Sequence, residues 1–166
     1  MLITRPAVGP SATAFARSAM PPAVALERMA EYPLPAMFTK GLIFPAVTRT
    51  EGQEGAWDRV GKSRTIHLGD GGSVIETLVE WTPGSSFAYE LTRFTDVFDR
   101  LVVGVRGEWS VAPDGDGSLI RWTWEFAPRP GRRWLMTHVV AHLWRHYAQA
   151  ILVPAVRDAA LEPAVR

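Results

Sequence analysis

The sequence predicts an α+β fold in which a curved antiparallel sheet wraps around one long C-terminal helix, with two short helices after the first strand. Three observations predict this fold. From about residue 57 to residue 126, apolar and polar residues alternate as they do in strands, and glycine-rich turns separate the runs. Between residues 131 and 152 the apolar spacing becomes that of an amphipathic helix. Prolines near the N-terminus divide a further helical region into two short pieces.

Size and composition favour one soluble domain. The chain has 166 residues, which suits a single core, and we assign the domain to residues 11–153, between a flexible arm (1–10) and a C-terminal tail (154–166). The absence of cysteine excludes a disulfide scaffold and a cysteine nucleophile. Eighteen basic and 17 acidic residues leave a net charge of +1, so no charge surplus favours nucleic acid. No run reaches the ~18 apolar residues of a membrane span, and we expect a cytoplasmic monomer or homodimer with no integral membrane segment.

The N-terminal part predicts one strand and two short helices. Ala12, Ala14 and Ala16 alternate with larger residues, which indicates a strand over Ser11–Ser18. Pro21 and Pro22 suit the first turn of a helix that ends before Pro33. A second short helix covers 34–38, and an extended segment follows at 43–49.

Turn signals then divide the sheet region into strands. Gly69-Asp-Gly-Gly and Asp114-Gly-Asp-Gly predict hairpin turns, and Pro83-Gly84 suits a type II turn. We expect the long helix at 131–152 to end or break at Pro154. The predicted strands of this region cover 60–68, 73–81, 87–94, 101–111 and 119–126.

The last predicted hairpin separates apolar and polar residues onto opposite faces. A four-residue turn places Trp109 opposite Trp122 and Gly107 opposite Trp124, and Gly107 leaves room there for a large ring or a bend. The predicted inner face carries Val105, Trp109, Val111, Ile120, Trp122, Trp124 and Phe126. The predicted solvated face carries Arg106, Glu108, Ser110, Arg121, Thr123 and Glu125.

A glutamate falls on the apolar face of the middle hairpin. If Pro83-Gly84 is the turn centre, Glu80 lies opposite Phe87, Leu78 opposite Tyr89, and Glu76 opposite Leu91, among apolar side chains. A carboxylate there needs a partner, or its pKa rises. Two alternatives stay open: a longer loop turns Glu76 outward, or Glu76 makes a structural hydrogen bond to a neighbouring strand. The four-residue loop before this strand places Arg64 on the opposite face unless the strand is bulged.

Three histidines follow one another at a spacing of four on the last helix: His138, His142 and His146. They lie at the polar border of the apolar stripe, and we interpret them as rim residues of the core rather than metal ligands or ligand contacts. No HExxH motif, GxSxG elbow or glycine-rich phosphate loop occurs. We therefore expect no metal and no cofactor. His142, in the middle of the helix, is predicted to lie over the sheet.

Several segments together resemble the SRPBCC superfamily, the START-like and birch-pollen-allergen-like group, and in particular its polyketide cyclase/dehydrase branch. These segments are WDRVGKSRTIHL (57–68), DGGSVIE (70–76), FAYEL (87–91) and GSLIRWTWEFAP (117–128). The resemblance spans residues 11–152. It implies a helix-grip fold with an apolar cavity between the sheet and the C-terminal helix, and the binding or conversion of lipids, sterols or aromatic polyketides. Members of this superfamily share no single set of catalytic residues, so the resemblance assigns no catalytic residue to this chain.

Our leading hypothesis is a binding module for a hydrophobic, aromatic or lipid-like small molecule. The alternative is a polyketide cyclase/dehydratase-type enzyme in which Glu76, Tyr89 or His142 transfers a proton. A third reading is a collapsed cavity in a partner-binding subunit. A large exposed apolar patch on the outer sheet face would favour it, and the charged residues Arg106, Glu108, Arg121 and Glu125 argue against such a patch on at least two strands. The candidate ligand-binding residues are Glu76, Leu78, Tyr89, Leu91, Trp109, Trp122, Trp124, Val139 and Leu143.

Overall fold

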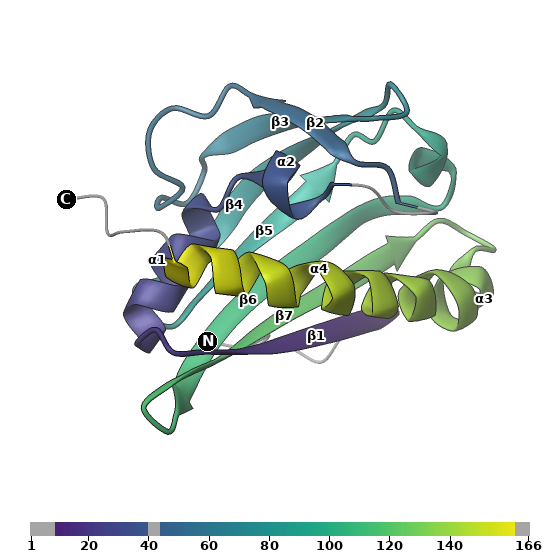
Figure 1. The fold of residues 1–166 in the computed structure, drawn as a ribbon. Helices are drawn as coiled ribbons and strands as arrows, with labels where there is room; N and C mark the ends of the chain where they lie inside the picture. The colour runs from purple at the N-terminus through teal and green to yellow at the C-terminus, as the bar shows by residue number, and fades with distance from the viewer. Residues whose placement is uncertain (1–8, 40–43, 162–166) are drawn as a thin grey trace.

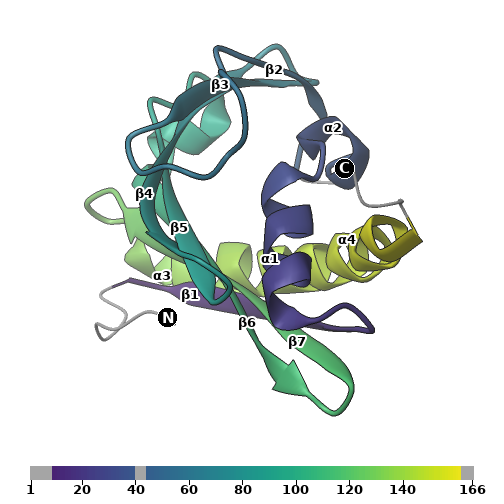
Figure 2. The same cartoon turned by 90° about the vertical axis from the view of Figure 1, so that its left-hand side faces the viewer.

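The computed structural model, which describes residues 9–39 and 44–161, has the predicted helix-grip architecture. One seven-stranded antiparallel sheet, in the order β1-β7-β6-β5-β4-β3-β2, curves around the long helix α4 (Figures 1 and 2). The predicted arm lies outside the described residues apart from Gly9 and Pro10. The elements are β1 (Ser11–Ser18), α1 (Pro22–Glu31), α2 (Leu34–Met37), β2 (Val47–Glu51), β3 (Ser63–Leu68), β4 (Ser73–Thr82), β5 (Ser86–Thr92), the 3₁₀ turn η1 (Val97–Arg100), β6 (Val102–Asp114), β7 (Gly117–Pro128), α3 (Arg133–Leu135), the π-helical turn η2 (Met136–Val140) and α4 (Ala141–Leu161).

The edge strand β1 fastens α4 to the sheet. Ala12, Ala14 and Ala16 point inward and are buried, and their short side chains let the helix pack closely on the strand. On the open side of β1, the Gln149 side-chain amide accepts a hydrogen bond from the Phe15 N–H (3.0 Å) and donates one to the Phe15 carbonyl (2.7 Å). The amide therefore occupies backbone groups that an edge strand leaves unpaired.

The last two strands pair in the predicted register. Trp109 lies opposite Trp122 and Gly107 opposite Trp124, and all the residues predicted for the inner face are buried. The prediction that the opposite face is solvated was wrong, because Glu108, Ser110, Thr123 and Glu125 are buried there. The long side chain of Arg106, on the same face, is itself largely covered. Its guanidinium lies 2.7 Å from the Glu80 carboxylate and 3.9 Å from that of Glu108.

The turn before β4 is one residue longer than predicted, and this corrects the position of Arg64. The Leu68 N–H donates to the Gly72 carbonyl (2.8 Å), so His67 pairs with Ser73 across a five-residue loop. A shift of one residue moves every side chain to the other face. Arg64 therefore lies directly opposite Glu76, on the same face, and no bulge in β3 is needed.

The middle hairpin agrees with the prediction near its open end. Glu76 pairs with Leu91 and Leu78 with Tyr89. A bulge at Val79 then shifts the pairing, so Glu80 lies opposite Ala88 and not, as predicted, opposite Phe87. The bulge lies between the turn and the site and leaves the inward direction of Glu76 unchanged.

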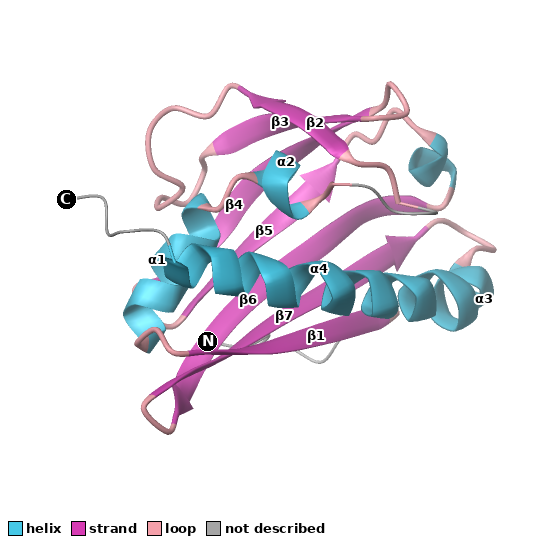
Figure 3. Ribbon diagram, in the orientation of Figure 1, coloured by secondary structure: helices cyan, strands magenta, loops and turns pink. Residues whose placement is uncertain are grey.

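The C-terminal helix is longer than the proline pattern predicts. α4 continues through Pro154 to Leu161, so the predicted break at Pro154 was wrong. Pro154 is on the exposed side, whereas Leu152, Ala155 and Val156 are buried against the sheet and α1. Their burial outweighs the one backbone hydrogen bond that proline removes. Figure 3 shows the uninterrupted helix. No helix in the described ranges is both long and apolar enough to cross a membrane.

Candidate functional site

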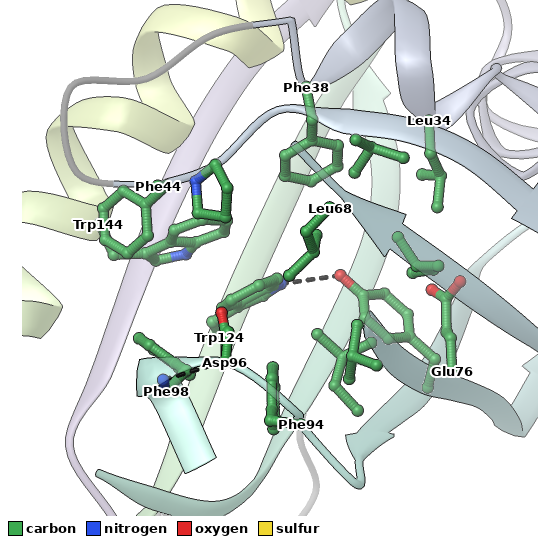
Figure 4. Close-up of a pocket in the computed structure, with 16 residues that line it drawn as sticks. Leu34, Phe38, Phe44, Leu68, Glu76, Phe94, Asp96, Phe98, Trp124 and Trp144 are labelled. Atoms are coloured by element: carbon green, nitrogen blue, oxygen red, sulfur yellow. Dashed lines mark hydrogen bonds between the residues drawn. The ribbon is translucent and has the colours of Figure 1, made fainter. Parts of the chain in front are cut away.

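The candidate site is a cavity of about 90 Å³ under the curved part of the sheet (Figure 4). Its walls come from the inner faces of β2, β3, β4, β5 and β7, from α2 and the residues after it, from the segment around η1 and from one side of α4. The lining residues are almost all apolar or aromatic: Leu34, Phe38, Phe44, Pro45, Val47, Ile66, Leu68, Val74, Glu76, Tyr89, Leu91, Phe94, Asp96, Phe98, Trp124 and Trp144.

The indole rings of the last hairpin point inward, as predicted, and they pack against one another and against α4. Trp109 and Trp122 stack with their ring centroids 4.8 Å apart, and Trp124 stacks on Trp144 of α4 at 3.6 Å. Trp124 and Trp144 form part of the cavity wall, whereas Trp109 and Trp122 lie in the packed core behind it. The interior is therefore part packed aromatic core and part cavity.

Tyr89 stands at the boundary between the packed rings and the cavity. Its ring lies over Gly107, where any Cβ would overlap it, so the predicted space at Gly107 is filled by Tyr89. The hydroxyl oxygen accepts hydrogen bonds from the indole N–H groups of Trp122 (3.0 Å) and Trp124 (2.7 Å). Figure 4 shows the bond to Trp124.

The Tyr89 hydroxyl keeps its proton. Burial, reinforced by the negative charge of Glu76, raises the pKa of Tyr89 well above its ordinary value. A phenol offers two acceptor lone pairs and one donor proton, and the two indoles occupy the lone pairs. Within residues 9–39 and 44–161, no acceptor takes the proton. The hydroxyl is thus a donor that an oxygen or nitrogen atom of a bound molecule can use.

Glu76 lines the cavity and is also paired, which agrees with its predicted inward direction and with the alternative of a hydrogen bond to a neighbouring strand. The Arg64 guanidinium donates to the Glu76 carboxylate and to Gln53 Oε1 (2.7 Å), and lies 4.2 Å from the centre of the Trp57 ring. Burial raises the pKa of Glu76, and the charge of Arg64 counteracts part of that rise. Glu76 therefore presents a paired carboxylate to the cavity, and Arg64 lies outside the lining.

Asp96 is the other carboxyl in the lining. Its Oδ1 accepts a hydrogen bond from the Phe98 N–H (3.0 Å) and so caps η1. Partial burial raises the pKa of Asp96. Its bond to the turn gives Asp96 a structural role that also orients Phe98 toward the cavity. Over the part of the chain that the structure describes, no three histidine or carboxylate side chains are grouped to hold a metal ion.

The structure brings together four of the nine candidate binding residues. Glu76, Tyr89, Leu91 and Trp124 line the cavity. Leu78, Trp109 and Trp122 are buried in the core outside the lining, Leu143 is half-buried, and Val139 is exposed.

His142, expected over the sheet, is at the surface of α4. It precedes the inward-facing Trp144 by two residues, which is about 200° around a helix of 3.6 residues per turn. It therefore points away from the cavity.

Sequence reasoning missed the aromatic side chains that complete the cavity. Phe38, Phe44, Phe94 and Phe98 come from loops, helix ends and the η1 turn, where no repeating spacing marks a buried face. Trp144 was detectable, because it lies four residues from both Val140 and Ala148 on the apolar side of the helix.

Comparisons with known proteins agree with this fold. The model of the family described as "Polyketide cyclase / dehydrase and lipid transport" matches residues 10–156. Among solved structures, Ara h 8.0201 is 15% identical with a TM-score of 0.66, and the match covers 91% of this chain and 97% of that one.

Two further solved structures have the same fold. The ginseng major latex-like protein 151 from Panax ginseng is 13% identical, with a TM-score of 0.64 and coverage of 92% and 97%. A norcoclaurine synthase point mutant from Thalictrum flavum, in complex with a transition-state analogue, is 12% identical, with a TM-score of 0.64 and coverage of 93% and 98%. No curated protein matches the chain. At these identities the structural matches show a shared fold.

Proposed function

Because the chain belongs to the polyketide cyclase/dehydrase and lipid transport family of the SRPBCC superfamily, we propose that it binds a small apolar molecule in the cavity between the sheet and α4. The lining supports this proposal, since apolar walls release water when an apolar molecule enters. Among the described residues that line the cavity, only Glu76 and Asp96 are acidic or basic residues, and both already have hydrogen-bond partners within the protein.

The observation that carries the proposal is the protonated Tyr89 hydroxyl in an apolar wall. Its oxygen is fully used by two indoles, and its proton is available for donation. A bound molecule with one acceptor, such as a carbonyl oxygen, pairs with that proton and gains orientation. We therefore propose a ring-containing ligand with an acceptor on its edge.

The size of the cavity limits what enters without rearrangement. At about 90 Å³ it is smaller than the ~150 Å³ apolar cavity that accommodates benzene in an engineered protein. A ring-sized ligand must displace side chains at the rim. Phe38 and Phe44 are half-buried and contact Trp144 edge-on or stacked, so they are the side chains that we expect to move.

The test compares two ligands of nearly equal shape. Acetophenone and ethylbenzene differ mainly in the carbonyl that Tyr89 would bind. Titration followed by intrinsic tryptophan fluorescence reports binding, because Trp124 and Trp144 form part of the wall. We expect both to bind and the ketone to bind more tightly, by about 0.5–1.5 kcal/mol for one neutral hydrogen bond. Equal affinities would contradict the role of Tyr89, and no binding by either would contradict the cavity proposal.

A pair of identical substitutions locates the binding site. Val74→Phe adds bulk inside the cavity, whereas Val60→Phe adds the same bulk at an exposed position outside it. We expect Val74→Phe to weaken binding of both ligands and Val60→Phe to leave it unchanged. If both variants bind like the wild type, the ligands bind elsewhere.

A cyclase or dehydratase activity is the second candidate. It is supported by Tyr89 and Glu76 lining one cavity, where a phenol donor could polarise a carbonyl and a carboxylate of raised pKa could accept a proton. Incubation with β-keto substrates should then show turnover that Glu76→Gln abolishes. His142→Ala, at the surface, is the matched control that should retain it. Absence of turnover in the wild type would refute the enzyme and leave the binding proposal standing.

A further inference from the structure

Two surface histidines of α4 face each other through the nitrogen atoms that bind metals. His142 and His146 are both exposed, and their Nε2 atoms are 3.2 Å apart. The ring centroids are 4.6 Å apart and the planes are inclined by 74°. A spacing of four residues brings two side chains together on one face of a helix. This pair lies on the outside of the helix and is separate from the cavity.

The separation of the two nitrogens equals that of two ligands on one metal ion. Zinc binds histidine nitrogen at about 2.0–2.1 Å, and two ligands at a tetrahedral angle are then about 3.3 Å apart. We propose that His142 and His146 form a binding site for a divalent transition-metal ion of the Zn²⁺, Ni²⁺ or Cu²⁺ class, the ions that imidazole favours. This goes beyond the expectation from sequence, which counted all three helix histidines as rim residues.

The proton balance of the site is simple. Without metal, the 3.2 Å contact requires one ring to carry its proton on Nε2 and donate it to the other. In the metal-bound form both rings present a bare Nε2 and keep a proton on Nδ1. On metal binding the donating ring therefore moves its proton from Nε2 to Nδ1 by exchange with water, and two neutral rings release no net proton. Water completes its coordination, because both rings are open to solvent.

The third histidine of the stripe is not part of the site. His138 lies within the π-helical turn Met136–Val140, whereas His142 and His146 lie on the regular helix α4. His138 instead contacts the ring of Trp134, with centroids 5.3 Å apart. Two protein ligands, and not three, are therefore available.

The helix holds the pair in position before a metal arrives. One turn after His146, Gln149 is bonded to both backbone groups of Phe15, which ties this part of α4 to β1. The two ligands are on one rigid element, so binding requires only side-chain rotation. Arg145 is the adjacent cation in sequence and is also exposed, where solvent and salt screen its charge.

Isothermal titration of the full chain with NiCl₂, and separately with ZnCl₂, tests the site. We expect one ion per chain for the wild type. His142→Ala and His146→Ala should each weaken binding by more than about tenfold, the lower limit for losing even an outer-shell partner. His138→Ala is the matched control on the same helix and should bind like the wild type. All three positions are exposed, so we expect each variant to retain the wild-type circular dichroism spectrum.

The outcomes separate clearly. Loss of binding in both variants with retention in His138→Ala supports the site. Retained binding in the double variant His142→Ala/His146→Ala, or equal weakening by His138→Ala, would overturn it, as would absence of binding in the wild type. None of these results depends on a ligand in the cavity, so the site and the proposed function fail or stand independently.

Discussion

Replacing Tyr89 with phenylalanine removes the acceptor of two buried hydrogen bonds. The indole N–H groups of Trp122 and Trp124, at 3.0 and 2.7 Å from the hydroxyl oxygen, then have no partner in an apolar interior. A buried donor without a partner costs about 1–3 kcal/mol, so the two together cost about 2–6 kcal/mol. Since a domain is stable by only about 5–15 kcal/mol, Tyr89→Phe removes a large part of the free energy of unfolding.

Urea unfolding followed by tryptophan fluorescence measures this loss. With an m-value of about 2 kcal/mol/M, the predicted loss lowers the midpoint by about 1–3 M at an unchanged slope. Tyr147→Phe is the matched control, because its hydroxyl is buried without a hydrogen-bond partner in the structure as described. Removing that hydroxyl should leave stability unchanged or raise it. The reasoning fails if Tyr89→Phe unfolds at the wild-type midpoint, or if Tyr147→Phe loses as much as Tyr89→Phe.

Three further substitutions test the surroundings of the site. Arg64→Met leaves the Glu76 carboxylate buried without its partner and should lower stability by about 3–5 kcal/mol at neutral pH. Burial raises the folded-state pKa of Glu76 above 4.5, so the carboxylate takes up a proton as the pH falls toward that value. The urea midpoint of the variant should therefore recover toward that of the wild type over this pH range. Gly107→Ala places a Cβ in the ring of Tyr89 and should lower stability by about 1–3 kcal/mol, with a changed near-ultraviolet circular dichroism spectrum. Pro154→Ala restores a backbone donor inside α4 and should raise the unfolding temperature, by the equivalent of up to about 3 kcal/mol.

Two of these three substitutions have a control variant, and the third has a result that would refute it. Arg49→Met breaks an exposed ion pair with Glu51 and should change stability little at any pH. At Gly69 an added Cβ would be in ordinary contact with Ala46, so Gly69→Ala should be far milder than Gly107→Ala. A Pro154→Ala protein that unfolds at a lower temperature than the wild type would contradict our account of α4.

The pairing of the last two strands was predictable because it depends on residues close together in the sequence. Alternation over the last two strands and one four-residue turn sufficed to place Trp109 opposite Trp122 and to identify the inner face. The same reasoning failed for Arg64, since Gly69-Asp-Gly-Gly closes as readily with five loop residues as with four. A glycine-rich turn removes the steric differences that would fix its length. One residue of loop then decides whether an arginine is at the surface or paired with a buried carboxylate.

The cavity was less predictable than the sheet because non-periodic segments determine its volume. Inward indoles were predicted correctly, but whether they enclose space depends on how they stack with Trp144 and on the phenylalanines around α2 and η1. Such contacts join residues far apart in the chain, and no spacing in the sequence encodes them. The buried outer-face carboxylates have the same origin, since alternation assigns a face and says nothing of what covers it.

Stability and recognition depend on the same hydroxyl. The oxygen of Tyr89 satisfies two donors of the packed core, while its proton is available toward the cavity. A substitution there changes both the fold's stability and the donor that a ligand would use, so a mutant alone cannot separate the two effects. Varying the ligand does separate them, because acetophenone and ethylbenzene encounter the same protein. If the wild type binds the ketone more tightly and Tyr89→Phe is less stable, then the Tyr89 hydroxyl has both roles: its oxygen stabilises the core and its proton binds the ligand.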